Sequence, residues 1–345
     1  VRSYAVEAAF LGSHACAELV ASGVRLPRAY LVEQRPDEAD PIESRFALLL
    51  QDFSPDDGWR QEGALSPPAA RASLATLARL HAFFWRGAAL WRRGGEVTAE
   101  LTAAVWPAGG YGQPSMQPTD QFELLAQKCA AHIGSLGAEF ASSPELSGID
   151  LGAMGEALQR EAPAAAAETH PCDAEAGGDA EAAAPFVTLI HGDPKAANLF
   201  LRDAPSGGAA PPEVALIDFQ WCGFGVAATD VAHHIAAALA PECVSGDGER
   251  ELLDHYHAEL CAALAASGAA QDAAHAASSV ISRAQLQTQY ESALLDMCRL
   301  VFAYQWSRAT FGVASLNKNS YNKEVRSAVW LVLRCDALLR KRGAL

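Results

Sequence analysis

Two short polar sequences, each next to an apolar segment, constrain this chain more than any other feature. The first is His191–Asn198, which reads HGDPKAAN and follows the apolar segment 186–190. The second is Ile217–Phe219, which ends the apolar segment 214–217. Short apolar runs bounded by Gly, Pro, Asp and Asn are typical of strands joined by turns. With a further short run at 199–201, the pattern predicts a β-hairpin that brings both polar sequences to one end of a small sheet.

The first polar sequence has the residue types of a catalytic loop. It fits the pattern H-x-D-x-x-x-x-N, in which the aspartate is a base. Asp193 is the candidate to accept the proton of an attacking hydroxyl. Lys195, two residues later, is the candidate cation that offsets charge on a phosphoryl group in transfer. We expect His191 to brace the loop by hydrogen bonds rather than to take part in the chemistry.

Two oxygen-bearing side chains predict a magnesium site. Magnesium is a hard cation that prefers oxygen ligands and keeps several waters. The amide of Asn198 and the carboxylate of Asp218 supply two such oxygens from opposite sides of the predicted hairpin. Ordinary turn preferences explain Gly, Asp, Pro and Asn in a loop. They do not explain a second aspartate at the end of an apolar strand, so we interpret the pair as functional.

At these residues the chain resembles the protein-kinase-like small-molecule phosphotransferases. This group includes aminoglycoside phosphotransferases, choline kinases and the ecdysteroid-kinase-like (CHK kinase-like) proteins. Leu80–Trp85 (LHAFFW) is similar to a helix end of that group, and Phe46–Phe53 (FALLLQDF) is similar to its strand and hinge. The resemblance implies an α+β, two-lobed protein-kinase-like fold, with a short antiparallel sheet in an incomplete N-lobe and a mainly helical C-lobe. It also implies ATP-dependent phosphorylation of a small-molecule hydroxyl, with Mg²⁺.

The resemblance implies roles for residues outside the two polar sequences. The hinge residues Gln51, Asp52 and Phe53 would contact the nucleotide. Glu7 lies where the family has a glutamate that pairs with the ATP-anchoring lysine. Asp230 lies where the family has an aspartate that supports the catalytic loop.

The chain departs from the family pattern at two places. The family carries its anchoring lysine on a strand before the helix of Glu7, whereas the first lysine here is Lys128. The expectation is therefore that the lysine strand and the glycine-containing phosphate loop lie upstream of Val1. The residue after Asp218-Phe219 is Gln220 rather than a glycine or an acidic residue, and Gln220 is either a polar neighbour of the metal or a surface residue.

The pattern divides the chain into a partial N-lobe at 1–53 and a C-lobe at 54–345, which carries the catalytic loop 191–198 and the metal segment 217–219. Residues 161–184 are Ala, Glu, Asp and Gly with few large apolar side chains, which predicts a disordered insertion. The secondary structure expected nearest the N-terminus is a helix over 4–22, strands at 28–34 and 46–50, and a helix that starts at Ser66.

Composition excludes several other classes of protein. A net charge of −15 disfavours a nucleic-acid partner and is compatible with a cationic acceptor. The eight cysteines form no C-x-x-C pair, so a zinc site or a disulfide framework is not expected. No apolar run is long enough for a membrane span and no signal peptide is visible, which suggests a cytoplasmic protein.

Two functions stay open at the level of sequence. The first is an active small-molecule kinase, and the second is a non-catalytic binding module of the same fold that lacks the anchoring lysine. The acceptor also stays open. Aromatic and acidic residues near the C-terminus form either a cation-binding pocket or ordinary core, with Asp296 and Arg299 spaced to pair with each other: these are Tyr290, Glu291, Asp296, Arg299, Tyr304 and Trp306. His233-His234 are interpreted as helix residues, and His170 as incidental.

Overall fold

The structure is a computed structural model that describes residues 2–37, 39–203, 210–308, 311 and 324–345. The loop predicted between the strands near 201 and 214 falls partly on residues 204–209, which lie outside the described part of the chain.

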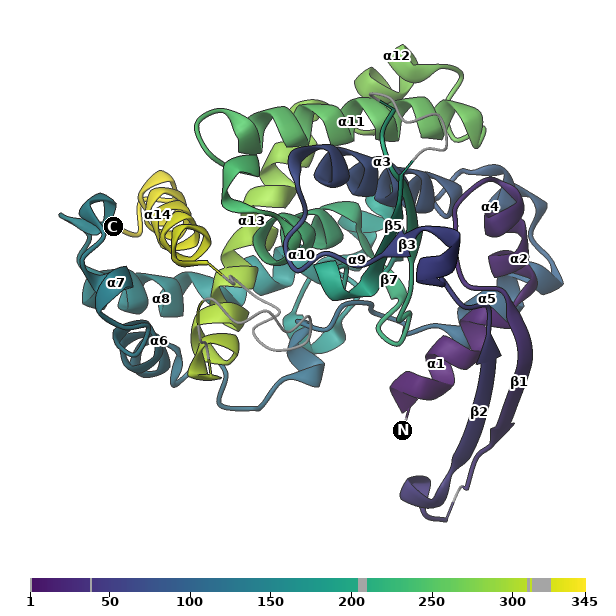
Figure 1. Cartoon of the computed structure of the whole chain (residues 1–345), viewed down its shortest axis with the longest axis horizontal. Helices are drawn as coiled ribbons and strands as arrows, with labels where there is room; N and C mark the ends of the chain where they lie inside the picture. The colour runs from purple at the N-terminus through teal and green to yellow at the C-terminus, as the bar shows by residue number, and fades with distance from the viewer. Residues whose placement is uncertain (1, 38, 204–209, 309–310, 312–323) are drawn as a thin grey trace.

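The N-terminal part consists of two short helices and a β-hairpin. Helices α1 (Arg2–Leu11) and α2 (His14–Ala21) replace the single helix predicted over 4–22, because Ser13 starts a new helix by accepting a hydrogen bond from the Cys16 amide. Strands β1 (Ala29–Arg35) and β2 (Arg45–Leu50) pair antiparallel, within one residue of the predicted bounds. Figure 1 shows this hairpin extending away from a mainly helical body.

Two small antiparallel sheets carry the polar sequences. Strands β3 (Trp59–Arg60), β5 (Leu199–Arg202) and β6 (Glu213–Leu216) form one sheet in the order β3-β5-β6. Strand β4 (Val187–Ile190) pairs with β7 (Gly223–Val226) in the other. The predicted β5–β6 hairpin is confirmed, since Leu199 faces Leu216 across the ladder.

Helices make up most of the body. A buried helix, α10, lies at its centre, with every residue buried from Ala227 to Ala238. It packs on α13, which in turn packs on α8, while α3 packs on α11. The helices between α2 and the C-terminus are α3 (Pro67–Phe83), α4 (Ala89–Arg93), α5 (Glu96–Ala104), α6 (Leu125–Gly134), α7 (Ala138–Ala141), α8 (Leu151–Thr169), α9 (Ala180–Ala183), α10 (Ala227–Ala238), α11 (Gly248–Ala266), α12 (Ala273–His275), α13 (Arg283–Ala303) and α14 (Val325–Lys341).

The prediction of a disordered insertion at 161–184 is wrong. Helix α8 continues through Thr169 and buries Ala162, Ala165 and Ala166 in the main core. Their small side chains allow α8 to lie close to α6 and α13. An alanine-rich sequence is therefore ordered here because its small side chains let helices pack closely, and large apolar side chains are not needed.

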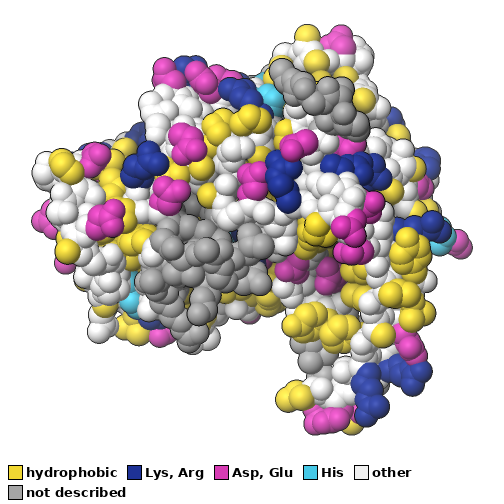
Figure 2. Space-filling view, in the orientation of Figure 1, with side chains coloured by type: hydrophobic (Ala, Val, Ile, Leu, Met, Phe, Trp, Pro, Cys, Tyr) yellow, Lys and Arg dark blue, Asp and Glu magenta, His cyan; other side chains and the backbone are white. Residues whose placement is uncertain are grey.

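The molecular surface mixes acidic and basic side chains, as Figure 2 shows for one face. Apolar side chains gather on the projecting hairpin in the same view. The exposed large apolar residues there are Tyr30, Leu31, Ile42, Phe46 and Leu49. Among the described residues, no helix combines the length and apolar character that crossing a bilayer requires.

Candidate active site

The predicted catalytic loop, residues 191–198, begins where β4 ends and is held in place by Asp230 of α10. Asp230 Oδ2 accepts the His191 amide (2.7 Å) and Oδ1 accepts the Gly192 amide (2.9 Å). Gly192 has φ +86°, and a Cβ there would lie 2.3 Å from the Trp221 carbonyl oxygen, so the turn requires glycine. His81 also contacts Asp230, with Nε2 3.0 Å from Oδ2. Asp230 therefore supports the loop in the way the resemblance implies.

The Asp193 carboxylate lies at the centre of three potential donors. Lys195 Nζ donates to Oδ2 (2.5 Å), and the Asn198 amide nitrogen lies 3.3 Å from the same oxygen. His233 Nε2 lies 3.3 Å from Oδ1. Asp193 is buried, which by itself would raise its pKa, but the bond and charge of His233 and the charge of Lys195 lower the pKa below the ordinary value. The carboxylate is thus held ionised, as an acceptor of hydrogen bonds.

The two candidate metal ligands lie at the end of the β5–β6 hairpin. The Ile217 amide donates to the Asn198 carbonyl oxygen (3.0 Å), so Asp218 follows directly after the residue that bonds to Asn198. Asn198 Nδ2 donates to the Asp193 carbonyl oxygen (2.8 Å), so its amide oxygen is the atom left for a cation. Burial and then repulsion by the Asp193 charge raise the pKa of Asp218, although the charge of Lys195 opposes this rise.

His191 joins the catalytic loop to the metal segment. Its Nε2–H donates to the Ile217 carbonyl oxygen (2.9 Å), and its Nδ1 accepts the Asp193 amide (3.3 Å). The ring packs on Phe219 with centroids 4.6 Å apart. Complete burial lowers the pKa of His191, and a neutral ring suits this one-donor, one-acceptor arrangement. These contacts fix the loop relative to the segment 217–219, as expected for a residue that supports the loop by hydrogen bonds.

Glu7 contacts the metal segment from α1. Its Oε1 accepts the Phe219 amide (3.1 Å), one residue after Asp218. Burial, followed by repulsion from Asp218, raises the pKa of Glu7. Arg2, on the same helix, does not pair with Glu7; its guanidinium lies over the Trp106 ring at 4.3 Å.

The three residues predicted to form the hinge differ in their surroundings. The Gln51 amide donates to the Arg28 carbonyl oxygen (2.8 Å), and Asp52 is exposed. Phe53 is buried, with ring centroids 4.9 Å from Trp59 and 5.3 Å from Phe200. Phe200 follows the catalytic loop by two residues, so Phe53 is the hinge residue that packs near the site.

Sequence reasoning missed a second support of the loop on α10. His233 approaches Asp193, and His234 Nδ1–H donates to the Pro194 carbonyl oxygen (2.7 Å). With Asp230 they occupy positions i, i+3 and i+4, which share one face of a helix. The pattern D-x-x-H-H on a helix next to a catalytic loop was the available signal, and the interpretation as plain helix residues overlooked it.

Residues 106–111 form a further support that the sequence did not reveal. Their backbone bonds to 221–224 through the Trp106, Gly109 and Gly110 amides, and the Tyr111 amide donates to the Gly192 carbonyl oxygen (2.9 Å). Gly109 and Gly223 make this possible, because a Cβ on Gly223 would lie 2.5 Å from the Trp106 carbonyl oxygen. Residues 106–111 therefore connect the loop 191–198 to the chain that follows the segment 217–219 through backbone hydrogen bonds.

Of the residues near the C-terminus interpreted as either a cation pocket or ordinary core, Tyr290, Asp296, Arg299 and Trp306 are buried. Asp296 and Arg299 pair with each other, as their spacing allowed, with Nε 2.7 Å from Oδ1. Arg299 is fully buried and also donates to the Gly112 carbonyl oxygen (2.6 Å). His170 is not incidental, since its Nε2 lies 2.9 Å from Asp296 Oδ2. This network fixes the segment that follows Tyr111.

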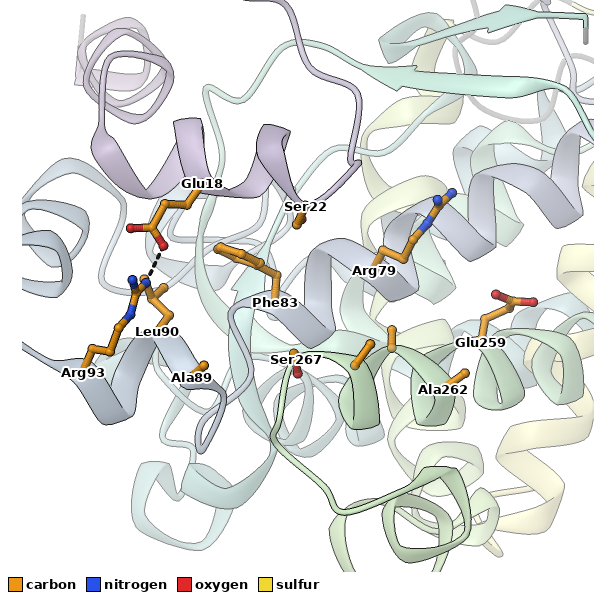
Figure 3. Close-up of a pocket in the computed structure, with 12 residues that line it drawn as sticks. Glu18, Ser22, Arg79, Phe83, Ala89, Leu90, Arg93, Glu259, Ala262 and Ser267 are labelled. Carbon is orange, nitrogen blue, oxygen red and sulfur yellow. Dashed lines mark hydrogen bonds and ion pairs between the residues drawn. The ribbon is translucent and has the colours of Figure 1, made fainter.

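A separate groove of about 560 Å³ lies between α2, α3, α4 and α11. Its lining includes Phe83, Leu90 and several alanines, and Figure 3 shows the ion pair between Glu18 and Arg93 among the lining residues. Its size is that of a ligand pocket. Its lining comes from those four helices and the turns that end α2 and α11, whereas the candidate catalytic residues lie on the β4–β5 and β6–β7 connections.

Comparison with known proteins places this architecture in a family. The chain matches the ecdysteroid kinase-like family over residues 26–268, and it belongs to that family. No curated protein matches it significantly. The α+β fold class predicted from the resemblance is confirmed.

Solved structures of small-molecule kinases align along most of the chain. A Plasmodium vivax ethanolamine kinase is 11% identical, and the alignment covers 96% of this chain and 72% of that kinase, with a TM-score of 0.40. A Cryptosporidium parvum choline kinase is 10% identical, with coverages of 95% and 77% and a TM-score of 0.44. A Ralstonia eutropha protein assigned as an aminoglycoside phosphotransferase is 12% identical, with coverages of 97% and 83% and a TM-score of 0.43.

Proposed function

We propose that the protein transfers a phosphoryl group from ATP to a hydroxyl of a small molecule. The observation that carries this proposal is the setting of Asp193: a buried, ionised carboxylate beside Lys195, on a loop fixed by Asp230. A carboxylate so held can orient the acceptor hydroxyl and take its proton as the oxygen–phosphorus bond forms. Lys195 would offset negative charge on the transferred group.

Asn198 and Asp218 suit a magnesium ion bound with the nucleotide. Among the described residues, no group of three or more His, Cys, Asp or Glu is arranged to hold a metal by itself. A magnesium site built from one carboxylate and one amide oxygen would be completed by phosphates and water. The raised pKa of Asp218 indicates a carboxylate whose charge is incompletely compensated, and a divalent cation would compensate it. When bound, magnesium would neutralise charge on the phosphates.

A binding module without catalysis is the second candidate. It is favoured by Glu7, whose Oε1 accepts the Phe219 amide and which makes no ion pair with a lysine or arginine among the described residues. Gln51, Asp52 and Phe53 would then hold a nucleotide or another ligand without phosphoryl transfer. An assay of phosphoryl transfer distinguishes the two candidates, because the kinase turns over ATP and the binding module does not.

The test compares Asp193→Asn and Asp218→Ala with the natural protein. Phosphorylation would be followed with Mg²⁺–ATP and a panel of an ecdysteroid, ethanolamine, choline and an aminoglycoside, and nucleotide affinity by calorimetry. We expect Asp193→Asn to lower kcat by about 10²–10⁴-fold with nucleotide affinity nearly unchanged, because only the proton acceptor is lost. Asp218→Ala should instead weaken binding of Mg²⁺–ATP, because a metal ligand is lost. Near-normal turnover in Asp193→Asn would refute its role as base.

A further inference from the structure

Helix α10 presents one face to the catalytic loop. Asp230, His233 and His234 follow the helical spacing i, i+3, i+4, and all three are buried. Asp230 fixes the backbone at the start of the loop, and His234 fixes the Pro194 carbonyl oxygen. Between these two anchors lies Asp193, and the α10 side chain that reaches its carboxylate is His233. The helix thus controls both the backbone and the reactive side chain of the loop.

The two oxygens of Asp193 have unequal surroundings. Oδ2 accepts from Lys195 Nζ at 2.5 Å and lies 3.3 Å from the Asn198 amide nitrogen. Oδ1 is buried without a hydrogen bond of regular geometry among the described residues, and His233 Nε2 lies 3.3 Å from it. Contacts of this length in an unliganded site commonly tighten when substrate binds. Without a donor near Oδ1, the carboxylate would be restrained from one side only.

We propose that His233 is a positioning residue, which holds Oδ1 of Asp193 so that the carboxylate meets the acceptor hydroxyl in the orientation needed for transfer. This inference rests on the proposed phosphotransferase function. The ring acts through Asp193 and does not itself touch the reacting atoms. A misorientation of the base affects the transfer step more than nucleotide binding, and errors of about 1 Å in such alignment cost up to about 10²-fold in rate.

The experiment compares His233→Leu with His233→Gln. Leucine fills similar space without a donor, whereas the glutamine amide can restore a nitrogen donor at comparable reach. Turnover of Mg²⁺–ATP would be measured by phosphate release with water as acceptor, and by phosphorylation of whichever acceptor the panel identifies. His132→Leu on α6 is the matched control, because His132 is a half-buried histidine whose described hydrogen bond runs from Nδ1 to the Phe302 carbonyl oxygen (2.8 Å) and not to residues 191–198. Unfolding midpoints would be recorded for all variants.

We expect His233→Leu to lower kcat by about 10–10²-fold with KM for Mg²⁺–ATP within about twofold, and His233→Gln to recover most of the loss. His132→Leu should change stability without lowering kcat. Equal kcat in His233→Leu and the natural protein would overturn the positioning role alone. Equal loss in the leucine and glutamine variants would also overturn it, since a lost fit rather than a lost donor would then be the cause. Absence of turnover in the natural protein would overturn the proposed function and this role together.

Discussion

His234 shows how one buried side chain can make the stability of this protein depend on pH. Its Nδ1–H donates to the Pro194 carbonyl oxygen (2.7 Å), so its Nε2 accepts from the Ser73 hydroxyl (2.7 Å). Burial, rather than either hydrogen bond, disfavours the charged ring, because the Ser73 hydroxyl could accept from Nε2–H while it donates to the Ala70 carbonyl oxygen (3.0 Å). Burial lowers the pKa of His234 from 6.5 to about 4. The unfolded chain therefore binds a proton at this residue in a pH range where the folded protein does not.

The sign of the effect follows from this lowered pKa. The contribution of His234 is fully present above pH 6.5 and is lost as the pH falls from 6.5 towards about 4. We expect the free energy of unfolding of the natural protein to drop by about 2–3 kcal/mol more than that of His234→Gln between pH 7.5 and pH 4.5. Urea unfolding at the two pH values measures this difference. Parallel losses in both proteins would show that His234 is not the titrating group.

The segment 106–111 is an element that joins regions far apart in the chain. It pairs with 221–224 and reaches Gly192 through Tyr111. Gly109 and Gly223 lie against each other with no room for a Cβ on either residue, so the backbones of the two segments are in direct contact. The geometry of residues 191–198 and 217–219 should therefore depend on glycine at both positions, because any side chain there would push the two backbones apart.

Gly223→Ala tests this dependence. A methyl group would lie 2.5 Å from the Trp106 carbonyl oxygen and 2.8 Å from Gly109 backbone atoms, so backbone must shift. We expect a loss of about 1–3 kcal/mol in the free energy of unfolding, together with a fall in turnover. Gly134→Ala is the matched control: its Cβ meets no atom within 4 Å, and it lies at the end of α6. It should be neutral or slightly stabilising, and a comparable loss in both variants would contradict the packing explanation.

The whole molecule buries nearly all of its thiols. All eight cysteines are free; seven are buried and Cys172 is partly exposed. Burial raises the pKa of Cys172 as well, so its thiolate is scarce near neutral pH.

We therefore expect an aromatic disulfide reagent to label Cys172 first in the native protein, slowly at pH 7 and faster as the pH rises. All eight cysteines should react after unfolding in urea. Mass spectrometry of peptides from partly labelled protein identifies the site, and Cys172→Ser provides the control. Rapid native labelling of a second cysteine would show that the core opens more readily than this packing allows.

The sequence by itself was sufficient for the features that depend on neighbours along the chain. The β5–β6 hairpin, the position of the loop 191–198 between β4 and β5, and the helix that starts after Ser66 were predicted correctly. Each depends on turn residues, capping residues or apolar periodicity within a short window, whereas the α+β fold class came from the resemblance. The roles of Asp193, Lys195, Asn198 and Asp218 come from the same local pattern, and they stay proposals until turnover is measured.

Only the tertiary structure decided which distant residues meet the loop. Glu7 on the Phe219 amide, His233 beside Asp193 and residues 106–111 across 221–224 are contacts between segments far apart in sequence. Helix α8 was mispredicted for the same reason, because its alanines are ordered by what α6 and α13 bring against them. A local pattern specifies what a segment can form, whereas its partners follow from the packing of the whole chain, which no short window contains.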